Sequence, residues 1–246
     1  MINIQGYNSV MKSRFLMLLL FAPIAWAQSA PDMASAAHYR QLLANDQVRV
    51  FAVTLRPLER TMARHDHDFL VVALLDCDVV MWPEGESDIV NFHFNPGDVR
   101  FYSGGRALGL RNDRTTEYRN VTVEFLNPKV TNYGYQSSGK WDYGAVSIAP
   151  PVDPHARFMN SMLLGAATVR DVQLLSRDPF PPPEKPGAEL LIPVTDVDLK
   201  GGEYERMRKS SGDAVWIPAG PKPTFLNATA DPIRFIVVQF TPEAKN

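Results

Sequence analysis

The chain has 246 residues, of which 45% are hydrophobic and 21% are charged. This composition is that of an ordinary globular protein, and it excludes the disordered, collagen-like and integral membrane classes. With 27 acidic and 25 basic side chains, the chain has no broad electrostatic attraction for nucleic acid or anionic lipid.

The first predicted element is an N-terminal signal peptide. Two basic residues precede an apolar stretch, Phe15 to Ala22, and the small-x-small sequence Ala25-Trp26-Ala27 follows it. The apolar run is shorter than the roughly 20 residues of a transmembrane helix. We therefore expect cleavage near Ala27, a secreted or periplasmic protein, and no membrane span in the mature chain. Both Met1 and Met11 remain open as the true start.

Short apolar runs rich in Val, Leu and Phe follow, separated by Gly, Pro, Asp and Asn, and no long stretch keeps a 3.6-residue period. This pattern predicts an all-β fold. The expected strands of a first set are 48–55, 69–75, 78–82, 89–94, 99–102 and 121–126. Those of a second set are 168–175, 189–194, 204–208, 214–217 and 234–240.

The second set of strands is a copy of the first. Gly97-Asp98 recurs as Gly212-Asp213, at an offset of 212 − 97 = 115 residues. The same offset pairs Gly105 with Gly220, Asn112 with Asn227, Arg119 with Arg234, Val123 with Val238, and Phe125 with Phe240. Repeated identities in one register indicate a duplication. We predict a signal peptide at 1–27, a barrel at 39–127, a Tyr-, Gly- and Pro-containing linker at 128–165, and a second barrel at 166–243.

The sequence His65-Asp66-His67 stands directly before the apolar run at 69–75 and is a candidate metal site. Residues i and i+2 of a strand project to the same face, so that both imidazoles can reach one ion inside a barrel. The alternative is a hydrogen-bonded histidine pair at the mouth of the barrel.

Together these features resemble the cupin superfamily, and in particular a bicupin. Its first motif is G-x5-H-x-H-x3,4-E-x6-G, of which His65 and His67 supply the histidine pair. Its second motif is G-x5-P-x-G-x2-H-x3-N, which the first half matches at Gly97, Gly105 and Asn112 and the second half at Gly212, Pro218, Gly220 and Asn227. The resemblance implies two tandem jelly-roll barrels (double-stranded β-helices), each of which in an intact cupin holds a divalent metal through three His and one Glu.

The metal-binding positions of that motif are largely lost. The second-motif histidine falls on Leu108 and on Pro223, and the first-motif glutamate of the first half falls on Val71 or Val72. In the second half the first motif falls on Pro183, Lys185 and Glu189, so that only its glutamate is kept. We therefore expect either one divalent transition metal (Fe, Mn, Cu or Zn) held by His65 and His67, or none.

Four aromatic residues in the linker are further candidates for ligand binding, together with Glu189: they are Tyr133, Tyr135, Trp141 and Tyr143. Aromatic rings in a loop can stack on planar ligands or sugars, and they can equally dock a long connection onto the barrels.

Three hypotheses about function follow. The first is an exported bicupin that binds a small molecule, or a metal weakly, without a complete metal site. The second is a metal-dependent cupin enzyme, a dioxygenase or a sugar-type isomerase, that uses His65 and His67. The third is a structural module that forms homo-oligomers. A cupin barrel hosts many chemistries, so the fold alone does not choose among them.

Overall fold

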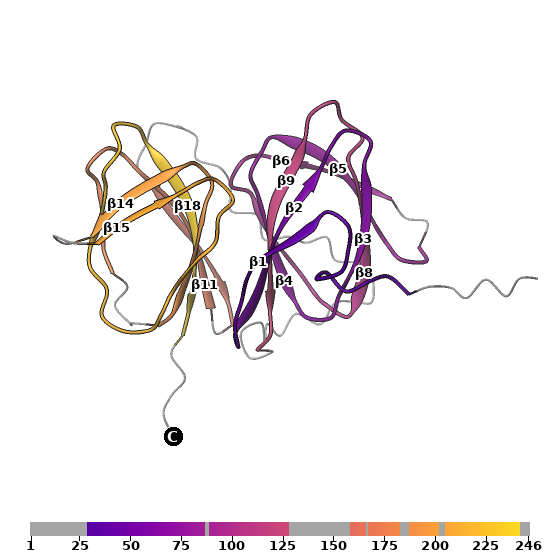
Figure 1. The fold of residues 1–246 in the computed structure, drawn as a ribbon, viewed down its shortest axis with the longest axis horizontal. Coiled ribbons are helices and arrows are strands. Elements are labelled where there is room, and N and C mark those ends of the chain that lie inside the picture. Colours follow the sequence, from indigo (N-terminus) through magenta and orange to yellow (C-terminus); the bar gives the residue numbers. More distant parts are fainter. Residues whose placement is uncertain are drawn as a thin grey trace, which may run out of the picture.

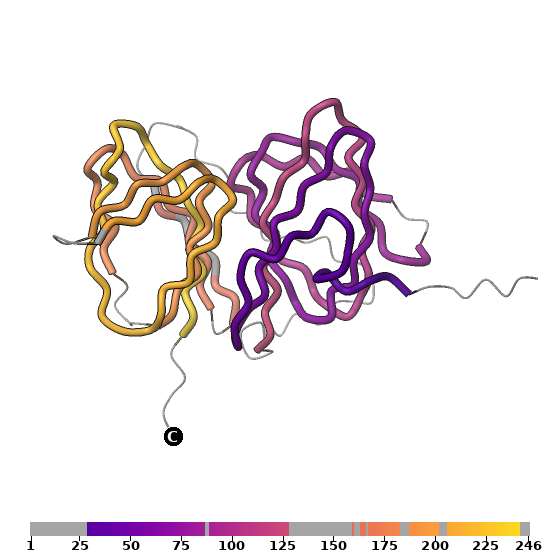
Figure 2. The backbone as a smooth tube through the Cα atoms, viewed as in Figure 1, coloured from indigo at the N-terminus to yellow at the C-terminus, as the bar shows by residue number. Residues whose placement is uncertain are grey.

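A computed structural model describes residues 29–86, 89–127, 158–165, 167–182, 187–201 and 205–241. It consists of two β-barrels that lie side by side, the N-terminal one drawn from indigo to magenta and the C-terminal one in orange and yellow (Figures 1 and 2). Within the described ranges there is no helix, and hence none that could span a membrane. The all-β prediction is confirmed.

The first barrel has two antiparallel sheets, one with the strand order β1-β2-β9-β4-β7 and one with β3-β8-β5-β6. The strands are β1 (Tyr39–Ala44), β2 (Val48–Leu55), β3 (Arg60–His65), β4 (Phe69–Ala73), β5 (Cys77–Pro83), β6 (Val90–Phe94), β7 (Val99–Tyr102), β8 (Arg106–Arg111) and β9 (Tyr118–Phe125). Side chains alternate between the two faces of each strand. On β9, for example, Tyr118 and Thr122 line the barrel interior, whereas Val121 and Val123 point toward the second barrel.

The second barrel repeats this arrangement, with the orders β10-β11-β18-β13-β16 and β12-β17-β14-β15. The strands are β10 (Phe158–Leu164), β11 (Ala167–Leu174), β12 (Pro179–Phe180), β13 (Glu189–Pro193), β14 (Val197–Gly201), β15 (Glu205–Lys209), β16 (Val215–Ile217), β17 (Phe225–Asn227) and β18 (Ile233–Phe240). Each strand of the first barrel therefore has a counterpart at the same place in the second.

The duplicated residues build duplicated turns. Gly97 and Gly212 both adopt a φ of +83°, and the backbone N–H of each donates to a carbonyl of the neighbouring strand. Asn112 donates through Nδ2 to the carbonyl oxygens of Leu55 and Thr116, and Asn227 makes the same bonds to Leu174 and Asp231. These turns impose local chemical requirements, which explains why they kept their residues in both copies.

A shared hydrophobic core joins the two barrels. It is formed by the outer faces of the two five-stranded sheets, which contribute Val50, Leu70 and Val123 from the first barrel and Val169, Leu190 and Val238 from the second, all fully buried. Each barrel also has an interior core of its own. Because burial of apolar area is the main favourable term in folding, the interface is expected to hold the barrels as one unit.

The observed strands differ from the predicted set in number. All eleven predicted strands are present, but β1, β3, β8, β10, β12, β14 and β17 were not predicted. Several of these are short or carry charged and small residues that break the apolar pattern, such as Arg60 and Arg64 in β3. Strand β10, at Phe158–Leu164, lies within the segment expected to be a linker.

The turn at Gly97 yields a prediction about stability. A Cβ atom at Gly97 would lie 2.3 Å from Cζ of Arg234. At Gly105, which has the similar φ of +82°, a Cβ would meet no atom of the described residues within 4 Å. Gly105→Ala is expected to cost only the left-handed backbone strain, about 1–2 kcal/mol. Gly97→Ala is expected to cost more, because the Arg234 guanidinium must also move. Denaturant unfolding of the two variants measures the difference, and equal costs would contradict the contact between the barrels.

Candidate functional site

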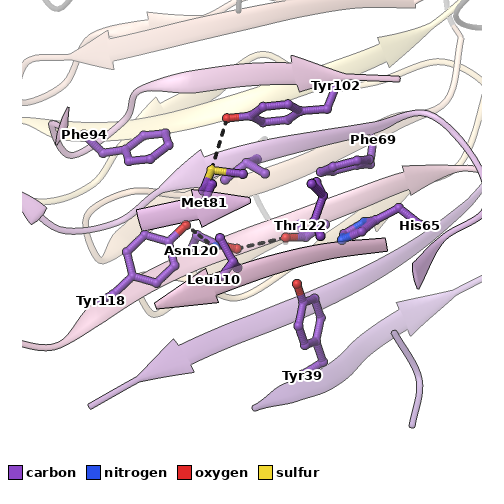
Figure 3. Close-up of a pocket in the computed structure, with 12 residues that line it drawn as sticks. Tyr39, His65, Phe69, Met81, Phe94, Tyr102, Leu110, Tyr118, Asn120 and Thr122 are labelled. Carbon is purple, nitrogen blue, oxygen red and sulfur yellow. Dashed lines mark hydrogen bonds between the residues drawn. The ribbon is translucent and has the colours of Figure 1, made fainter. Parts of the chain in front are cut away.

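An aromatic stack fills the interior of the first barrel (Figure 3). The His65 ring lies on the Phe69 ring with a centroid separation of 3.9 Å, and Phe69 in turn lies 5.1 Å from Tyr102. Tyr39 meets His65 edge-on at 6.2 Å. His65 is only 2% exposed, and burial lowers its pKa to about 3. The imidazole is therefore neutral at physiological pH.

Polar side chains of β9, which lies next to β4 in the same sheet, also line the barrel interior (Figure 3). Nδ2 of Asn120 donates to the hydroxyl of Tyr118 at 2.6 Å, and the hydroxyl of Thr122 donates to Oδ1 of Asn120 at 3.0 Å. Glu124 continues this row at the end of the strand, where it is fully buried and accepts a 2.5 Å hydrogen bond from Nε of Arg49. These polar groups therefore form hydrogen bonds with one another or with Arg49 and His67 rather than facing an open site.

The space left inside the barrel is about 10 Å³, which is about the room that a single water molecule needs. Val71 and Leu108 are among the residues that close it. The barrel interior therefore admits no substrate of organic size without rearrangement.

The structure separates His65 from His67. Strand β3 ends at His65, and the residues after it form a turn in which Asp68 accepts a hydrogen bond from the backbone N–H of Gly104 at 2.8 Å. His67 is exposed, and its backbone N–H donates to Glu124. One imidazole thus lies inside the barrel and the other on the surface. We expected both imidazoles on one face of a strand. The structure does not show this, because the strand ends before His67.

The residues of the first barrel do not fit a metal ion. Nδ1 of His65 is buried and has no hydrogen-bond partner among the described residues, so that one ligand atom is available. Burial, however, raises the pKa of Tyr102 to about 12 and that of Tyr39 further, which keeps both as neutral phenols. Across the described ranges, no three His, Cys, Asp or Glu side chains gather where they could hold a metal ion. Typical zinc and non-haem iron sites need three protein ligands.

Glu189, the other candidate from the sequence, lies in a buried ionic cluster of the second barrel. Its Oε1 atom accepts a 2.8 Å hydrogen bond from Arg170, and its Oε2 atom lies 3.7 Å from Nζ of Lys222. The side chains of Glu189 and Lys222 are 2% and 4% exposed. Lys222 also donates to the carbonyl oxygen of Gly187, and the Arg170 guanidinium lies over the Phe180 ring at 5.0 Å. Two cations thus surround the carboxylate, which does not fit a metal cation either.

This cluster replaces aromatic residues of the first barrel. Glu189 pairs with Gln239 and Ile217 as Phe69 pairs with Glu124 and Tyr102, so that Glu189 stands at the position of Phe69. The counterpart of Val71 is Leu191, so the strand register does not place Glu189 at the glutamate position where the motif spacing had placed it. Arg170 likewise pairs with Val237 as Phe51 pairs with Thr122. No sequence motif points to Arg170 or Lys222. They lie 189 − 170 = 19 and 222 − 189 = 33 residues from Glu189, and no short motif joins them.

The remaining sequence candidates are placed as follows. Tyr133, Tyr135, Trp141 and Tyr143 lie outside the described residues, as does the predicted signal peptide. The one cysteine of the chain, Cys77, was not among these candidates. It is a buried free thiol, and burial raises its pKa to about 12, so that it is a packed residue rather than a nucleophile.

No protein-family model and no curated protein sequence matches the chain. Solved structures match its fold. AerE from Microcystis aeruginosa aligns with a TM-score of 0.58 at 11% identity, over 83% of this chain and 97% of that chain. A cupin 2 conserved barrel domain protein from Leptotrichia buccalis aligns with a TM-score of 0.54 at 9% identity, over 85% and 90%. A salicylate 1,2-dioxygenase from Pseudaminobacter salicylatoxidans gives 0.52 at 12% identity, over 82% and 76%.

These likenesses extend over both barrels, and they agree with the strand order and with the duplicated motif residues Gly97, Asn112, Gly212 and Asn227. At such low identity they concern the fold and carry no activity to this chain. The chain therefore has a cupin fold, with two barrels in tandem.

Proposed function

We propose that this bicupin is an exported protein that binds a small molecule without a resident metal ion. Export rests on the predicted signal peptide, with its basic, apolar and small-x-small parts in order. We propose that no metal ion takes part because the residues at the positions of the cupin metal ligands are largely unable to bind one.

The observation that carries the proposal is the closed interior of the first barrel. His65 is the one motif histidine inside it, and its ring is stacked on Phe69 in a space of about 10 Å³. A metal-dependent dioxygenase or isomerase needs open coordination positions and room for a substrate beside them. In this barrel the second-motif histidine position is taken by Leu108 and the first-motif glutamate position by Val71 or Val72, and Leu108 and Val71 line the interior.

The second barrel supports the same proposal from a different direction. Its buried carboxylate, Glu189, is neutralised by Arg170 and Lys222 rather than left free for a cation. Any ligand of the protein is therefore expected to bind outside the usual metal centres of the two barrels.

Metal titration followed by thermal unfolding tests the proposal. A metal that binds only the folded state stabilises it by about 2.7 kcal/mol at a concentration one hundredfold above its Kd. We expect the Tm of the mature protein to be unchanged by a chelator and by Fe²⁺, Mn²⁺, Cu²⁺ or Zn²⁺. A rise in Tm with one of these ions that disappears in His65→Leu would support the enzyme hypothesis instead.

A further inference from the structure

A cleft of about 500 Å³ lies where the first barrel meets a turn of the second. Its walls include β1 and β2 of the first barrel and the turn at residues 211–213 of the second. This volume is within the range typical of small-molecule sites. Unlike the barrel interior, the cleft is open to solvent at exposed residues such as Arg40 and Arg56.

The duplication provides an internal comparison for this cleft. Arg234 of the second barrel donates through Nη1 to the carbonyl oxygen of Pro96, in a turn of the first barrel. Its counterpart Arg119 donates through Nη2 to the carbonyl oxygen of Ser211, in the matching turn of the second barrel. Both pairs obey the offset of 115 residues (234 − 119 and 211 − 96). The two arginines thus make reciprocal contacts across the interface.

The two arginines differ in their acidic partner. Arg234 donates through Nε and Nη2 to the two carboxylate oxygens of Asp171, at 3.0 and 2.7 Å. Asp171 pairs with Ile236 on the neighbouring strand. The counterpart of Ile236 in the first barrel is Val121 (236 − 121 = 115), and Val121 pairs with Ala52. Ala52 is therefore the counterpart of Asp171. A methyl group therefore stands beside Arg119 where a carboxylate stands beside Arg234. In the described part of the chain, no carboxylate forms an ion pair with Arg119.

The remaining charges of the cleft favour an anion. Besides Arg119 it is lined by Arg40, Arg56 and His38, and its two acids are already engaged. Glu59 lies 3.5 Å from Nδ1 of His38 and accepts a hydrogen bond from the backbone N–H of Arg56, and Asp213 accepts one from the backbone N–H of Ser210. Arginine forks bind carboxylates in a bidentate manner, as Arg234 does here.

We infer that the cleft binds a small organic carboxylate, whose carboxyl group takes the place beside Arg119 that the Asp171 carboxylate takes beside Arg234. The inference rests on the proposed function, which it deepens by naming the site and the class of ligand. Arg40, Arg56 and Arg119 attract the negative charge of the ligand. The turn at Gly212 forms the side of the cleft that belongs to the second barrel.

Titration calorimetry with benzoate and citrate tests the inference on the mature protein, with inorganic phosphate as a non-carboxylate anion. We expect at least one of the two carboxylates to bind more tightly than phosphate. Arg119→Gln is expected to weaken that binding about tenfold, since it removes a charge-assisted hydrogen-bond pair. Ala52→Asp is expected to weaken it as strongly, because an internal carboxylate then pairs with Arg119. The exposed residue Arg60, which does not line the cleft, provides the control Arg60→Gln, with unchanged affinity.

Three outcomes would overturn the inference. They are no binding of either carboxylate, equal or tighter binding of phosphate, and full affinity in Ala52→Asp. None of these outcomes changes the result expected from the metal titration. Conversely, a metal bound at His65 would not change the effect of Arg119→Gln on carboxylate binding. The two proposals can therefore fail separately. Retained thermal stability of Ala52→Asp shows that the variant is folded.

Discussion

Replacement of Glu189 by leucine is expected to lower the free energy of unfolding by about 3–5 kcal/mol, which is the usual cost of removing one partner from a buried ion pair. The Arg170 and Lys222 side chains are 12% and 4% exposed, so that neither charge can be rehydrated without local rearrangement. Burial already raises the pKa of Glu189 and lowers that of Arg170. Both shifts indicate that desolvation is the dominant cost in this cluster. Urea unfolding of the variant measures the loss.

The first barrel supplies the matched control for this experiment. It carries Phe51 and Phe69 at the positions of Arg170 and Glu189, and by the offset of 115 residues it carries Ala107 at the position of Lys222. The triple variant Arg170→Phe/Glu189→Phe/Lys222→Ala is expected to recover most of the lost stability, because well-packed apolar groups often replace buried ion clusters without cost.

The exposed pair of Arg111 and Asp113 provides a second control, and Asp113→Asn is expected to change stability far less than Glu189→Leu. Equal effects of the two substitutions would show that the Glu189 cluster is no more important than a surface pair.

Acidification is expected to destabilise the protein through His65. Burial lowers the pKa of this imidazole from 6.5 to about 3, so that the unfolded chain takes up a proton at a higher pH than the folded chain does. Its contribution to stability is therefore fully present above pH 6.5 and is lost as the pH falls from there toward 3. The expected slope is about 1.4 kcal/mol per pH unit within that window.

Comparison with His65→Leu isolates this slope from that of the acidic residues. Leucine can pack against Phe69 and does not titrate. It also removes the buried Nδ1 atom, for which the described part of the chain offers no hydrogen-bond partner. The variant is expected to be at least as stable as the wild type at pH 7 and to lose less stability between pH 6.5 and 4. Parallel pH profiles for the two proteins would contradict the buried, neutral state of His65.

The duplicated fold could be predicted from the sequence because its turns make local demands. A left-handed φ at Gly97 and Gly212, and an asparagine that bonds several backbone groups at Asn112 and Asn227, restrict residue type wherever the turn occurs. Strands such as β3 and β8 could not be predicted, because arginines interrupt their apolar pattern: Arg60 and Arg64 in β3, and Arg106 and Arg111 in β8.

The position of His67 depends on tertiary contacts that the sequence does not display. An extended strand through residues 65–67 would place both imidazoles on one face. The observed strand ends at His65, where the backbone of His67 lies so close to Gly104 that a Cβ there would be 2.2 Å from the His67 carbonyl carbon. The approach of the Gly104 turn thus decides where the strand stops.

The ionic cluster of the second barrel could not be predicted from the repeat, because the offset between the two copies changes along the chain. The offset is 115 between β9 and β18, but it is 167 − 48 = 119 between β2 and β11 and 189 − 69 = 120 between β4 and β13. Insertions in the connecting loops cause these steps. A single offset therefore does not align Glu189 with Phe69 or Arg170 with Phe51, and only the strand registers show the exchange of aromatic for charged residues.

The most direct test of the account is the metal content of the mature protein, expressed with Fe, Mn, Cu and Zn in the medium and purified without chelator or affinity metal. Elemental analysis of the wild type and of His65→Leu measures it. The closed interior around His65 and the paired carboxylate of Glu189 predict no stoichiometric metal in either protein. One metal ion per chain in the wild type, lost in His65→Leu, would contradict the account.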